Sequence, residues 1–272
     1  MATKTVVITG ANSGIGKACV AVFTKAGWNV AATMRTPDAF DVSAYSGRVK
    51  KYRLDVTDAD SVVTAFEDIR RDMGSIDAVI NNAGYGLVGV FEAISDESLQ
   101  RQFETNVIGL MRVTREAVKY MRPQRSGTIV QISSVGGKIT FPLYAPYHGT
   151  KWAVEGFSES LHYELEQFNI RVKIVEPGII KTDFAGRSLE FVTSDSVREY
   201  DAYVNTFLKA AEAAVKDAVD PSVVAQAIYV ACTDGTAKLR YPVGKPAPAM
   251  IKLRKLVSDS MFFKIVKKAY GI

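Results

Sequence analysis

The sequence is poor in residues that bind metals or form cross-links: its 272 residues include two cysteines and two histidines. Cys19 and Cys232 stand far apart, each in an apolar helical pattern, so we expect two reduced thiols in the core. His148 and His162 form no Cys/His cluster with zinc-ligand spacing. We therefore predict no metal site and no disulfide framework.

Long apolar runs are also missing. No stretch of about 18 apolar residues is present, so we expect no transmembrane helix. The first apolar run, Val6–Ile8, is too short for the core of a signal peptide and soon meets Gly10. We expect a cytoplasmic protein, and its 47% hydrophobic and 23% charged residues are ordinary for a globular chain.

The formal net charge of +5 is unevenly placed, because many of the cations lie in a tail at about 247–272. They are Lys252, Arg254, Lys255, Lys264, Lys267 and Lys268. Apolar residues separate them, which predicts a basic amphipathic helical segment. Such a segment can contact an anionic membrane as a peripheral element, but more often it packs on its own domain and exposes the basic face. No recognition motif accompanies the charge, so we predict no nucleic-acid partner.

Short β-branched runs alternate with longer amphipathic segments. The expected strands are Thr5–Thr9, Asn29–Met34, Val49–Leu54, Ala78–Asn81, Gly127–Ile132, Val172–Glu176 and Lys238–Val243. The expected helices are Gly14–Ala26, Ala59–Met73, Asp96–Met121, Tyr147–Gln167 and Pro221–Cys232. This alternation predicts an α/β fold with a doubly wound, seven-stranded parallel sheet, helices on both faces and strand order 3-2-1-4-5-6-7.

One segment breaks the alternation, and the chain is otherwise expected to form a single Rossmann-like domain over 1–272. From about 181 to 220 we expect no strand, and Ser188–Val192 and Tyr200–Ala214 have helical patterns. The segment follows the sixth strand, and insertions at the carboxyl ends of strands surround the ligand crevice. It is therefore the predicted substrate lid.

A glycine-rich turn follows the first strand, in Thr9-Gly10-Ala11-Asn12-Ser13-Gly14-Ile15-Gly16. Glycine lets the backbone approach a pyrophosphate, and the next helix directs its N-terminal amides at that anion. A merely structural turn is the alternative. The second strand ends in Met34-Arg35, where a cation suits a ribose 2′-phosphate and favours NADP over NAD. Asp55 follows the third strand and either binds adenine or caps the next helix.

Tyr147 and Lys151 are four residues apart, which places both on one face of a helix. A neighbouring ammonium favours the phenolate and lowers the pKa of a tyrosine, which can then act as an acid/base. Taken alone, this spacing usually indicates only a pair of residues on the protein surface. Ser134 ends the fifth strand and can hydrogen-bond a substrate oxygen, with Ser133 as a rival. Tyr144 has no lysine four residues later and is the weaker candidate acid.

Together these motifs resemble one family, the short-chain dehydrogenases/reductases, in their compact branch. The resemblance covers roughly residues 4–245 and rests on Thr9-Gly10-x3-Gly14-x-Gly16, Asp55, Asn81-Asn82-Ala83-Gly84, Asn106, Ser134, Tyr147-x3-Lys151 and Pro177-Gly178. It implies a catalytic tetrad in which Tyr147 is the acid/base, Lys151 lowers its pKa and binds the nicotinamide ribose, Ser134 orients the substrate oxygen and Asn106 holds a relay water. The residues expected to bind the cofactor are Gly10, Asn12, Ser13, Gly14, Ile15, Gly16, Arg35, Asp55, Val56, Asn82, Ala83, Gly84, Ile132, Tyr147, Lys151, Pro177, Gly178, Ile180 and Thr182.

The favoured function is an NADP(H)-dependent oxidoreductase acting on a carbonyl or alcohol. Apolar and aromatic residues on the expected pocket side suggest a lipophilic substrate, as in the hydroxysteroid and retinol dehydrogenases that the chain resembles: Phe141, Leu143, Tyr144, Phe184 and Phe191. A catalytically silent dinucleotide sensor is the main alternative. A sugar-nucleotide epimerase is a third reading, disfavoured by the glycine spacing. The family resemblance also implies a homodimer or homotetramer.

Overall fold

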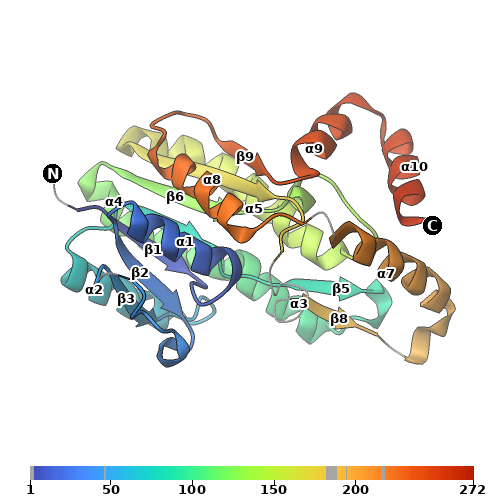
Figure 1. Cartoon of the computed structure of the whole chain (residues 1–272), viewed down its shortest axis with the longest axis horizontal. Coiled ribbons are helices and arrows are strands. Elements are labelled where there is room, and N and C mark those ends of the chain that lie inside the picture. Colours follow the sequence, from blue (N-terminus) through green and yellow to red (C-terminus); the bar gives the residue numbers. More distant parts are fainter. Residues whose placement is uncertain (1–2, 46, 182–188, 194, 216–217) are drawn as a thin grey trace.

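The computed structural model describes residues 3–45, 47–181, 189–193, 195–215 and 218–272. Its centre is a seven-stranded parallel sheet in the order β3-β2-β1-β4-β6-β7-β9 (Figure 1). The strands are β1 (Thr5–Thr9), β2 (Asn29–Met34), β3 (Val49–Arg53), β4 (Ala78–Asn81), β6 (Gly127–Ile132), β7 (Ile170–Pro177) and β9 (Arg240–Val243). Numbered along the chain, these seven strands have the order 3-2-1-4-5-6-7, so the predicted fold class and strand order are confirmed.

The helices of the described residues are α1 (Gly14–Lys25), α2 (Ala59–Met73), α3 (Asp96–Phe103), α4 (Leu110–Gln124), α5 (Ala145–Leu165), α7 (Asp201–Val215), α8 (Pro221–Thr233), α9 (Ala247–Leu256) and α10 (Asp259–Tyr270). Both faces of the sheet are covered, one by α1 and α8 and the other by α2, α4 and α5. Helices α9 and α10 form a hairpin at one end of the molecule, where the C-terminus lies near α7 (Figure 1).

The sheet is buried on both faces, as the near-continuous apolar strands predict. Val6, Val7 and Ile8 of β1 are fully buried, and successive side chains point to opposite faces. Val6 and Ile8 join a core with α1 and α8, whereas Val7 joins one with α2, α4 and α5. The sheet thus holds the carboxyl ends of its strands at one fixed edge, where the candidate site lies.

The expected helix Asp96–Met121 is wrong as a single regular element. α3 ends at Phe103, a π-helical turn spans Glu104–Gly109, and α4 then begins at Leu110. π-helical turns arise where an extra residue enters a helix, often at functional sites. Here the turn carries Asn106.

The expectation of no strand after 181 is also wrong. Leu189–Val192, for which the sequence suggests a helix, forms β8 and pairs in parallel with β5 (Gly86–Gly89). A Cβ on Gly89 would lie 2.6 Å from the carbonyl oxygen of Val192, so the two strands meet too closely for a side chain there. β5 has two glycines among four residues, so its own sequence does not indicate a strand. The pairing of Leu189–Val192 with this distant segment therefore could not be predicted from the local sequence. The predicted helix over Tyr200–Ala214 is confirmed as α7.

Both cysteines are buried and unpaired, as expected. Cys19 of α1 and Cys232 of α8 lie in the same core cluster. Burial raises the pKa of the Cys232 thiol to about 12 and raises that of Cys19 as well. Both side chains therefore act as small apolar groups in the packing of α1 and α8.

Candidate active site

The turn after β1 depends on glycines. Gly10 and Gly14 have φ values of +65° and +49°. A Cβ on Gly16 would lie 2.2 Å from the carbonyl oxygen of Gly10, so the turn and α1 close without room for a side chain. Ser13 is the N-cap of α1, and among the described residues its hydroxyl caps none of the first amides. The N-terminus of α1 is therefore available to an anion.

Asn82 fastens the end of β4 to this turn. Its side-chain amide donates to the carbonyl oxygens of Thr9, at 2.9 Å, and Gly10, at 3.2 Å. The Thr9 hydroxyl accepts from the main-chain amides of Asn82 and Ala83, at 3.0 Å each. Asn82, Ala83 and the following Gly84 are thereby held beside the glycine turn, as the sequence predicts.

Arg35 and Asp55 lie at the neighbouring ends of β2 and β3. Arg35 is exposed directly after the buried Met34, and its charge acts on the Asp55 carboxylate. Partial burial raises the pKa of Asp55, but hydrogen bonds from Thr57 and the nearby Arg35 outweigh it, so the pKa is lowered overall. This edge of the sheet presents an exposed cation that makes no ion pair with any described residue.

The helix-capping interpretation of Asp55 is wrong. Asp58 is the N-cap of α2, and its carboxylate accepts from the amides of Asp60 and Ser61. Asp55 accepts instead from the amide and hydroxyl of Thr57, at 3.0 and 2.8 Å. Because Asp55 is only half-buried, its carboxylate remains accessible at the strand end.

Ser134, Tyr147 and Lys151 come together where β6 ends and α5 begins. The Ser134 hydroxyl oxygen accepts from the amide of Gly136 at 3.0 Å, and the Tyr147 phenol is hydrogen-bonded to the Ser134 side chain. One turn later in α5, the Lys151 Nζ donates to the carbonyl oxygen of Ile132 at 2.9 Å. It lies 5.6 Å from the centre of the Tyr147 ring. The predicted trio is one cluster and not a surface pair.

Burial governs the ionisation of this cluster. It raises the pKa of Tyr147 to about 12, against a smaller lowering by the Ser134 hydrogen bond. Burial also lowers the pKa of Lys151 to about 8, although the charge of Glu155 opposes this. The sequence predicts a lowered tyrosine pKa, whereas the protein alone shifts it upward. A buried group loses the hydration of its charged form, and for Tyr147 this loss outweighs the hydrogen bond from Ser134.

Ser133, the rival of Ser134, points elsewhere. It is buried, and its hydroxyl has no hydrogen-bond partner among the described residues. A Cβ on Gly137 would lie 2.6 Å from that hydroxyl oxygen, so the group is enclosed by the turn after β6. Of the two serines, Ser134 is the one that meets Tyr147.

Asn106 is buried in the π-helical turn and braces two segments. Its side-chain oxygen accepts from the amide of Tyr85 at 3.0 Å, and its nitrogen donates to the Tyr85 carbonyl oxygen at 2.7 Å. The same nitrogen lies 3.3 Å from the Thr150 hydroxyl, which donates to the carbonyl oxygen of Tyr147. These contacts fix Asn106 against the first turn of α5, next to Tyr147 and Lys151. Its role in a water relay stays a prediction.

The path expected for the nicotinamide end continues after β7. β7 ends at Pro177, and a Cβ on Gly178 would lie 2.8 Å from the carbonyl oxygen of Lys245. Ile180 forms a parallel bridge with Val219. Val56, after β3, and Ile132, at the end of β6, are buried at the same edge. Thr182 and Phe184 lie outside the described residues.

Aromatic rings line the side of Tyr147 that faces α7 and α10. Tyr144 lies 6.0 Å from the rings of both Tyr147 and Phe207, centre to centre. Phe207 of α7 stacks on Tyr270 of α10 at 5.2 Å, and Tyr270 lies 6.0 Å from Phe141. Sequence reasoning missed Phe207 and Tyr270. The signal for Tyr270 is its spacing of four from Val266, which continues a buried helical face.

His148 also belongs to this aromatic wall. It is buried, stacks on Tyr144 at 5.6 Å and accepts from the amide of Phe141 at 3.5 Å through Nδ1. Burial lowers the pKa of His148 to about 4, so the imidazole is neutral near pH 7. It is therefore a packing residue of the wall and supplies no charge to Tyr147.

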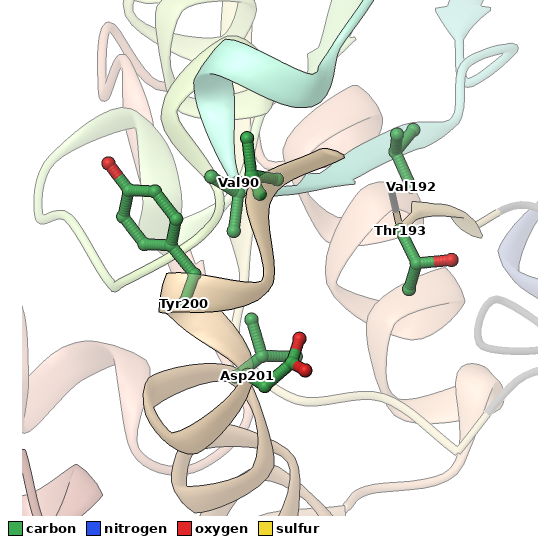
Figure 2. Close-up of a pocket in the computed structure, with 7 residues that line it drawn as sticks. Val90, Val192, Thr193, Tyr200 and Asp201 are labelled. Carbon is green, nitrogen blue, oxygen red and sulfur yellow. The ribbon is translucent and has the colours of Figure 1, made fainter. Parts of the chain in front are cut away.

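A cavity of about 190 Å³ lies between the ends of β5 and β8 and the start of α7 (Figure 2). It is lined by Val90, Val192, Thr193, Val197, Tyr200, Asp201 and Val204. Ser134, Tyr147 and Lys151 are not among these residues. Phe191, expected on the pocket side, precedes Val192 in β8 and is half-buried.

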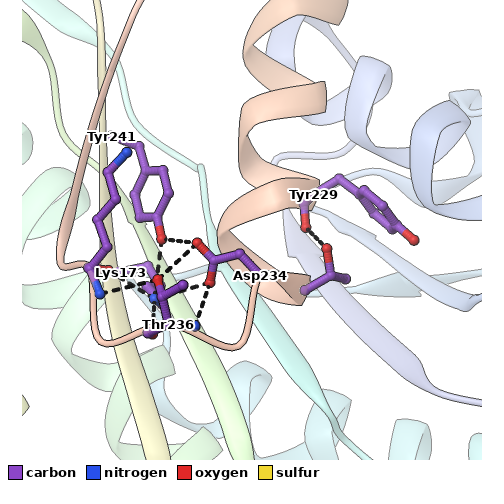
Figure 3. Close-up of polar contacts among 7 residues, drawn as sticks. Lys173, Tyr229, Asp234, Thr236 and Tyr241 are labelled. Atoms are coloured by element: carbon purple, nitrogen blue, oxygen red, sulfur yellow. Dashed lines mark hydrogen bonds and ion pairs between the residues drawn. The ribbon is translucent and has the colours of Figure 1, made fainter.

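A second buried lysine has a structural explanation. Lys173 of β7 is fully buried, and its Nζ donates to the carbonyl oxygens of Thr236 and Lys238, at 2.6 and 2.8 Å (Figure 3). The Asp234 carboxylate lies 3.5 Å away and also accepts from the Tyr241 hydroxyl. These partners neutralise and satisfy the ammonium and tie β7 to the segment before β9. Lys151 has no such set of partners.

Comparison with known proteins agrees with this geometry. A family model described as short chain dehydrogenase matches residues 4–192. The chain belongs to the short-chain dehydrogenase family. It is thus an oxidoreductase by family, with the glycine turn, Ser134, Tyr147 and Lys151 inside the matched region.

Individual relatives extend the match along the chain. The 3-ketodihydrosphingosine reductase of Bacteroides thetaiotaomicron is 32% identical, with all of both chains covered. A short-chain dehydrogenase structure from Streptomyces avermitilis is 33% identical, has a TM-score of 0.83 and covers 97% of this chain and 95% of its own. The structure of ElxO with NADP bound is 26% identical, has a TM-score of 0.75 and covers 91% and 99%.

In the described part of the chain, no three or more His, Cys, Asp and Glu side chains gather in an arrangement that could hold a metal ion. In that same part, no helix combines the length and apolar character needed to cross a bilayer.

Proposed function

We propose that this protein transfers a hydride between NADP(H) and a carbonyl or secondary alcohol carbon of a lipophilic substrate. The observation that carries the proposal is the cluster of Ser134, Tyr147 and Lys151 at the carboxyl edge of the sheet. This trio supplies an acid with a hydroxyl partner and a neighbouring amine. Those are the groups that a carbonyl oxygen needs when it becomes an alcohol.

The residues present fit a dinucleotide. The uncapped N-terminus of α1 and the closed Gly10–Gly16 turn suit a pyrophosphate, and Asn82 holds the adjoining chain in place. Exposed Arg35 at the end of β2 suits a ribose 2′-phosphate, which favours NADP(H) over NAD(H). A solved relative, ElxO, binds NADP, in line with this preference.

In the proposed mechanism, Ser134 and Tyr147 hold the substrate oxygen by hydrogen bonds, and Tyr147 gives it a proton during reduction. When bound, the nicotinamide supplies the hydride, and its oxidised ring carries a positive charge. That charge and the Lys151 ammonium both favour the phenolate that Tyr147 becomes. The high pKa of Tyr147 in the protein alone means that the acid is protonated and ready before the cofactor enters.

Lys151 and Asn106 support this proton transfer from Tyr147. Lys151 binds the ribose hydroxyls of the nicotinamide half and restores the proton that Tyr147 loses. Its lowered pKa, about 8, makes the ammonium a competent proton donor near neutral pH. Asn106, fixed between Tyr85 and Thr150, holds the water through which that proton is replaced.

A lipophilic substrate is supported by the wall beside Tyr147. Tyr144, Phe207, Tyr270 and Phe141 present rings there, and burial keeps His148 neutral. A relative with full coverage is named for the reduction of 3-ketodihydrosphingosine, a ketone with a long aliphatic chain. Both observations favour ketones with large apolar groups over small charged ones.

The test is a set of NADPH oxidation assays with three groups of substrates: long-chain aliphatic ketones, polycyclic ketones, and small charged keto acids. We expect turnover with one or both apolar groups and little with the keto acids. Turnover confined to the keto acids would refute the lipophilic assignment. A parallel titration with NADPH and NADH measures the cofactor preference, and tighter binding of NADH would refute the assignment of Arg35.

The same helices that carry the site expose apolar side chains suited to a homodimer or homotetramer interface. Phe103 precedes the π-helical turn, Ile108 lies in it, and Trp152 and Tyr163 lie on α5, with exposed fractions of 40, 39, 51 and 71%. A contact between copies would cover them. Size-exclusion chromatography with light scattering tests this, and Trp152→Glu is expected to yield monomers.

A further inference from the structure

The net positive charge of this protein comes from its last two helices. Residues 247–272 contain six cations and one carboxylate, which leaves 28 side chains of each sign in residues 1–246. The whole formal excess of +5 therefore lies in α9, α10 and the turn between them. An asymmetry of this size predicts an anionic partner for this segment.

The segment is firmly attached to the protein, so its outer face is well defined. Phe262 and Val266 of α10 are buried against Val135, Ile139 and Ala247. At the turn, Arg254 pairs with Asp259 and lies over the Phe262 ring, 5.1 Å from its centre. The Ser258 hydroxyl caps α10 by accepting from the amide of Met261. One face of α10 is thus fixed inward, and the opposite face points to solvent.

Large apolar side chains near the turn between α9 and α10 are exposed. Leu256 ends α9, and Met261 and Phe263 lie near the start of α10 on either side of the buried Phe262, with exposed fractions of 73, 55 and 51%. The turn that carries them projects away from the sheet (Figure 1). Exposed lysines lie on the same two helices, at positions 252, 255, 264, 267 and 268, and Lys267 is at the end of α10 that lies near Tyr203 and Thr206 of α7. We call this surface, Leu256, Met261, Phe263 and the five lysines, the basic tip.

We propose that the basic tip docks on the surface of an anionic phospholipid bilayer. Lipid head groups and the upper acyl region accept both kinds of side chain, because apolar groups enter the bilayer boundary while lysines remain with the phosphates. Each lysine near such a surface strengthens binding by about fivefold. This mode of binding needs no membrane-spanning helix.

The other anionic and apolar partners fit less well. A nucleic acid would take up the lysines but would leave Leu256 and Met261 in water, since only Phe263 offers a ring for stacking. A second copy of this chain would cover the apolar groups but would bring like charges together. A bilayer with acidic lipids satisfies both features at once.

The helix that carries part of the basic tip also contributes to the aromatic wall. Tyr270, near the end of α10, stacks on Phe207 and contacts Phe141, so the inner side of the helix belongs to that wall. The inference of docking stands on charge and exposure alone, and it does not depend on the reaction proposed above.

The experiment is co-sedimentation of the full chain with vesicles of phosphatidylcholine, with and without phosphatidylserine, at low and high salt. We expect binding only with phosphatidylserine, weakened by salt. Lys264→Glu with Lys268→Glu is expected to weaken it more than 20-fold. Lys25→Glu with Lys51→Glu, the matched control on exposed lysines elsewhere, is expected to change it less than about threefold.

A second pair of variants tests the apolar part. Met261→Ser with Phe263→Ser is expected to weaken vesicle binding at least tenfold, whereas Phe91→Ser, at a side chain 61% exposed on another surface, leaves it unchanged. In Phe263→Trp, the new tryptophan emission is expected to move to shorter wavelength only with phosphatidylserine vesicles. The proposal is overturned if the wild-type protein binds vesicles equally well with and without phosphatidylserine. It is also overturned if the tryptophan emission of Phe263→Trp does not shift. So does binding to nucleic acid or self-association in the absence of any vesicle binding.

Discussion

The Lys151 ammonium lies 5.6 Å from the centre of the Tyr147 ring, one helical turn away on α5. Lys151 is buried and Tyr147 is half-buried, and burial acts on the pKa values of the two groups in opposite directions. It raises the pKa of the tyrosine and lowers that of the lysine, because each loses hydration in its charged form. The protein by itself therefore disfavours the ion pair that phenolate and ammonium would make. A positively charged ligand beside them would favour the Tyr147 phenolate and would at the same time disfavour the Lys151 ammonium, because a like charge opposes a charged form.

Tyr147→Phe is predicted to lower kcat/KM by about 10²- to 10⁴-fold, the usual range for loss of a general acid. Its NADPH affinity is expected to stay within about twofold, since the ring and its packing remain. Steady-state assays and an NADPH fluorescence titration measure the two effects. Tyr144→Phe is the matched control, with a loss of less than about tenfold expected. If Tyr147→Phe kept the biological role of the protein intact, the silent sensor would be the better explanation.

Arg35→Ala is predicted to raise the KM for NADPH by roughly tenfold and to leave the KM for NADH unchanged. The exposed guanidinium makes no ion pair with the described residues, so its removal affects only a ligand that carries the extra phosphate. Competition titrations of both cofactors measure the change. Arg48→Ala, at the opposite end of β3, should alter neither value. Equal weakening of NADPH and NADH would show that Arg35 acts on the common part of the dinucleotide.

Much of this site follows from local sequence patterns. The Val and Ile runs predict every strand of the main sheet, and strand ends in a parallel sheet share one edge. That is enough to bring Gly10, Arg35, Asp55 and Ser134 to the same side. Tyr147 and Lys151 follow from helical spacing, since Tyr147 lies in the first turn of α5.

The remainder depends on contacts between distant segments. The strand at Leu189–Val192 forms through its pairing with Gly86–Gly89. Neither of the two segments has a sequence that predicts a strand by itself. The π-helical turn at Asn106 is held by hydrogen bonds to the main chain of Tyr85. The helical periodicity of the local sequence does not predict this contact. Tyr270 reaches the site only because α10 folds back over Val135 and Ile139. The pKa of Tyr147 requires its burial, which no spacing supplies.

Lys151→Met is predicted to make the protein more stable near pH 7 while abolishing turnover and weakening NADPH binding. The pKa of Lys151 is about 8 in the fold and near its ordinary 10.5 when unfolded. Below pH 8 the fold must keep a buried ammonium, which costs roughly 3 kcal/mol of stability. This figure is a net value that already includes the hydrogen bond from Lys151 to the Ile132 carbonyl oxygen. Between about pH 8 and 10.5 the unfolded chain binds more protons, so wild-type stability from this group rises with pH.

Urea unfolding at several pH values measures this effect. The stability advantage of Lys151→Met should be largest near pH 7 and shrink between about pH 8 and 10.5. Lys25→Met, at an exposed lysine of α1, should show a difference that does not vary with pH. An advantage of constant size would mean that packing, and not the buried charge, sets the stability. Unchanged NADPH affinity in Lys151→Met would argue against a contact between Lys151 and the ribose.

Tyr270→Ala is predicted to raise the KM for apolar ketones by about tenfold while leaving the KM for NADPH unchanged. The ring stacks on Phe207 at 5.2 Å and lies 6.0 Å from Phe141, and such ring pairs contribute about 1 kcal/mol beyond the area that they bury. Its loss would therefore loosen the substrate side of the site alone. Tyr163→Ala, at a ring 71% exposed on α5, is the control and should change neither KM. Tyr270→Phe keeps the ring and should restore the wild-type KM for the ketone. If Tyr270→Phe were as impaired as Tyr270→Ala, the hydroxyl and not the stacked ring would be the group that the substrate meets.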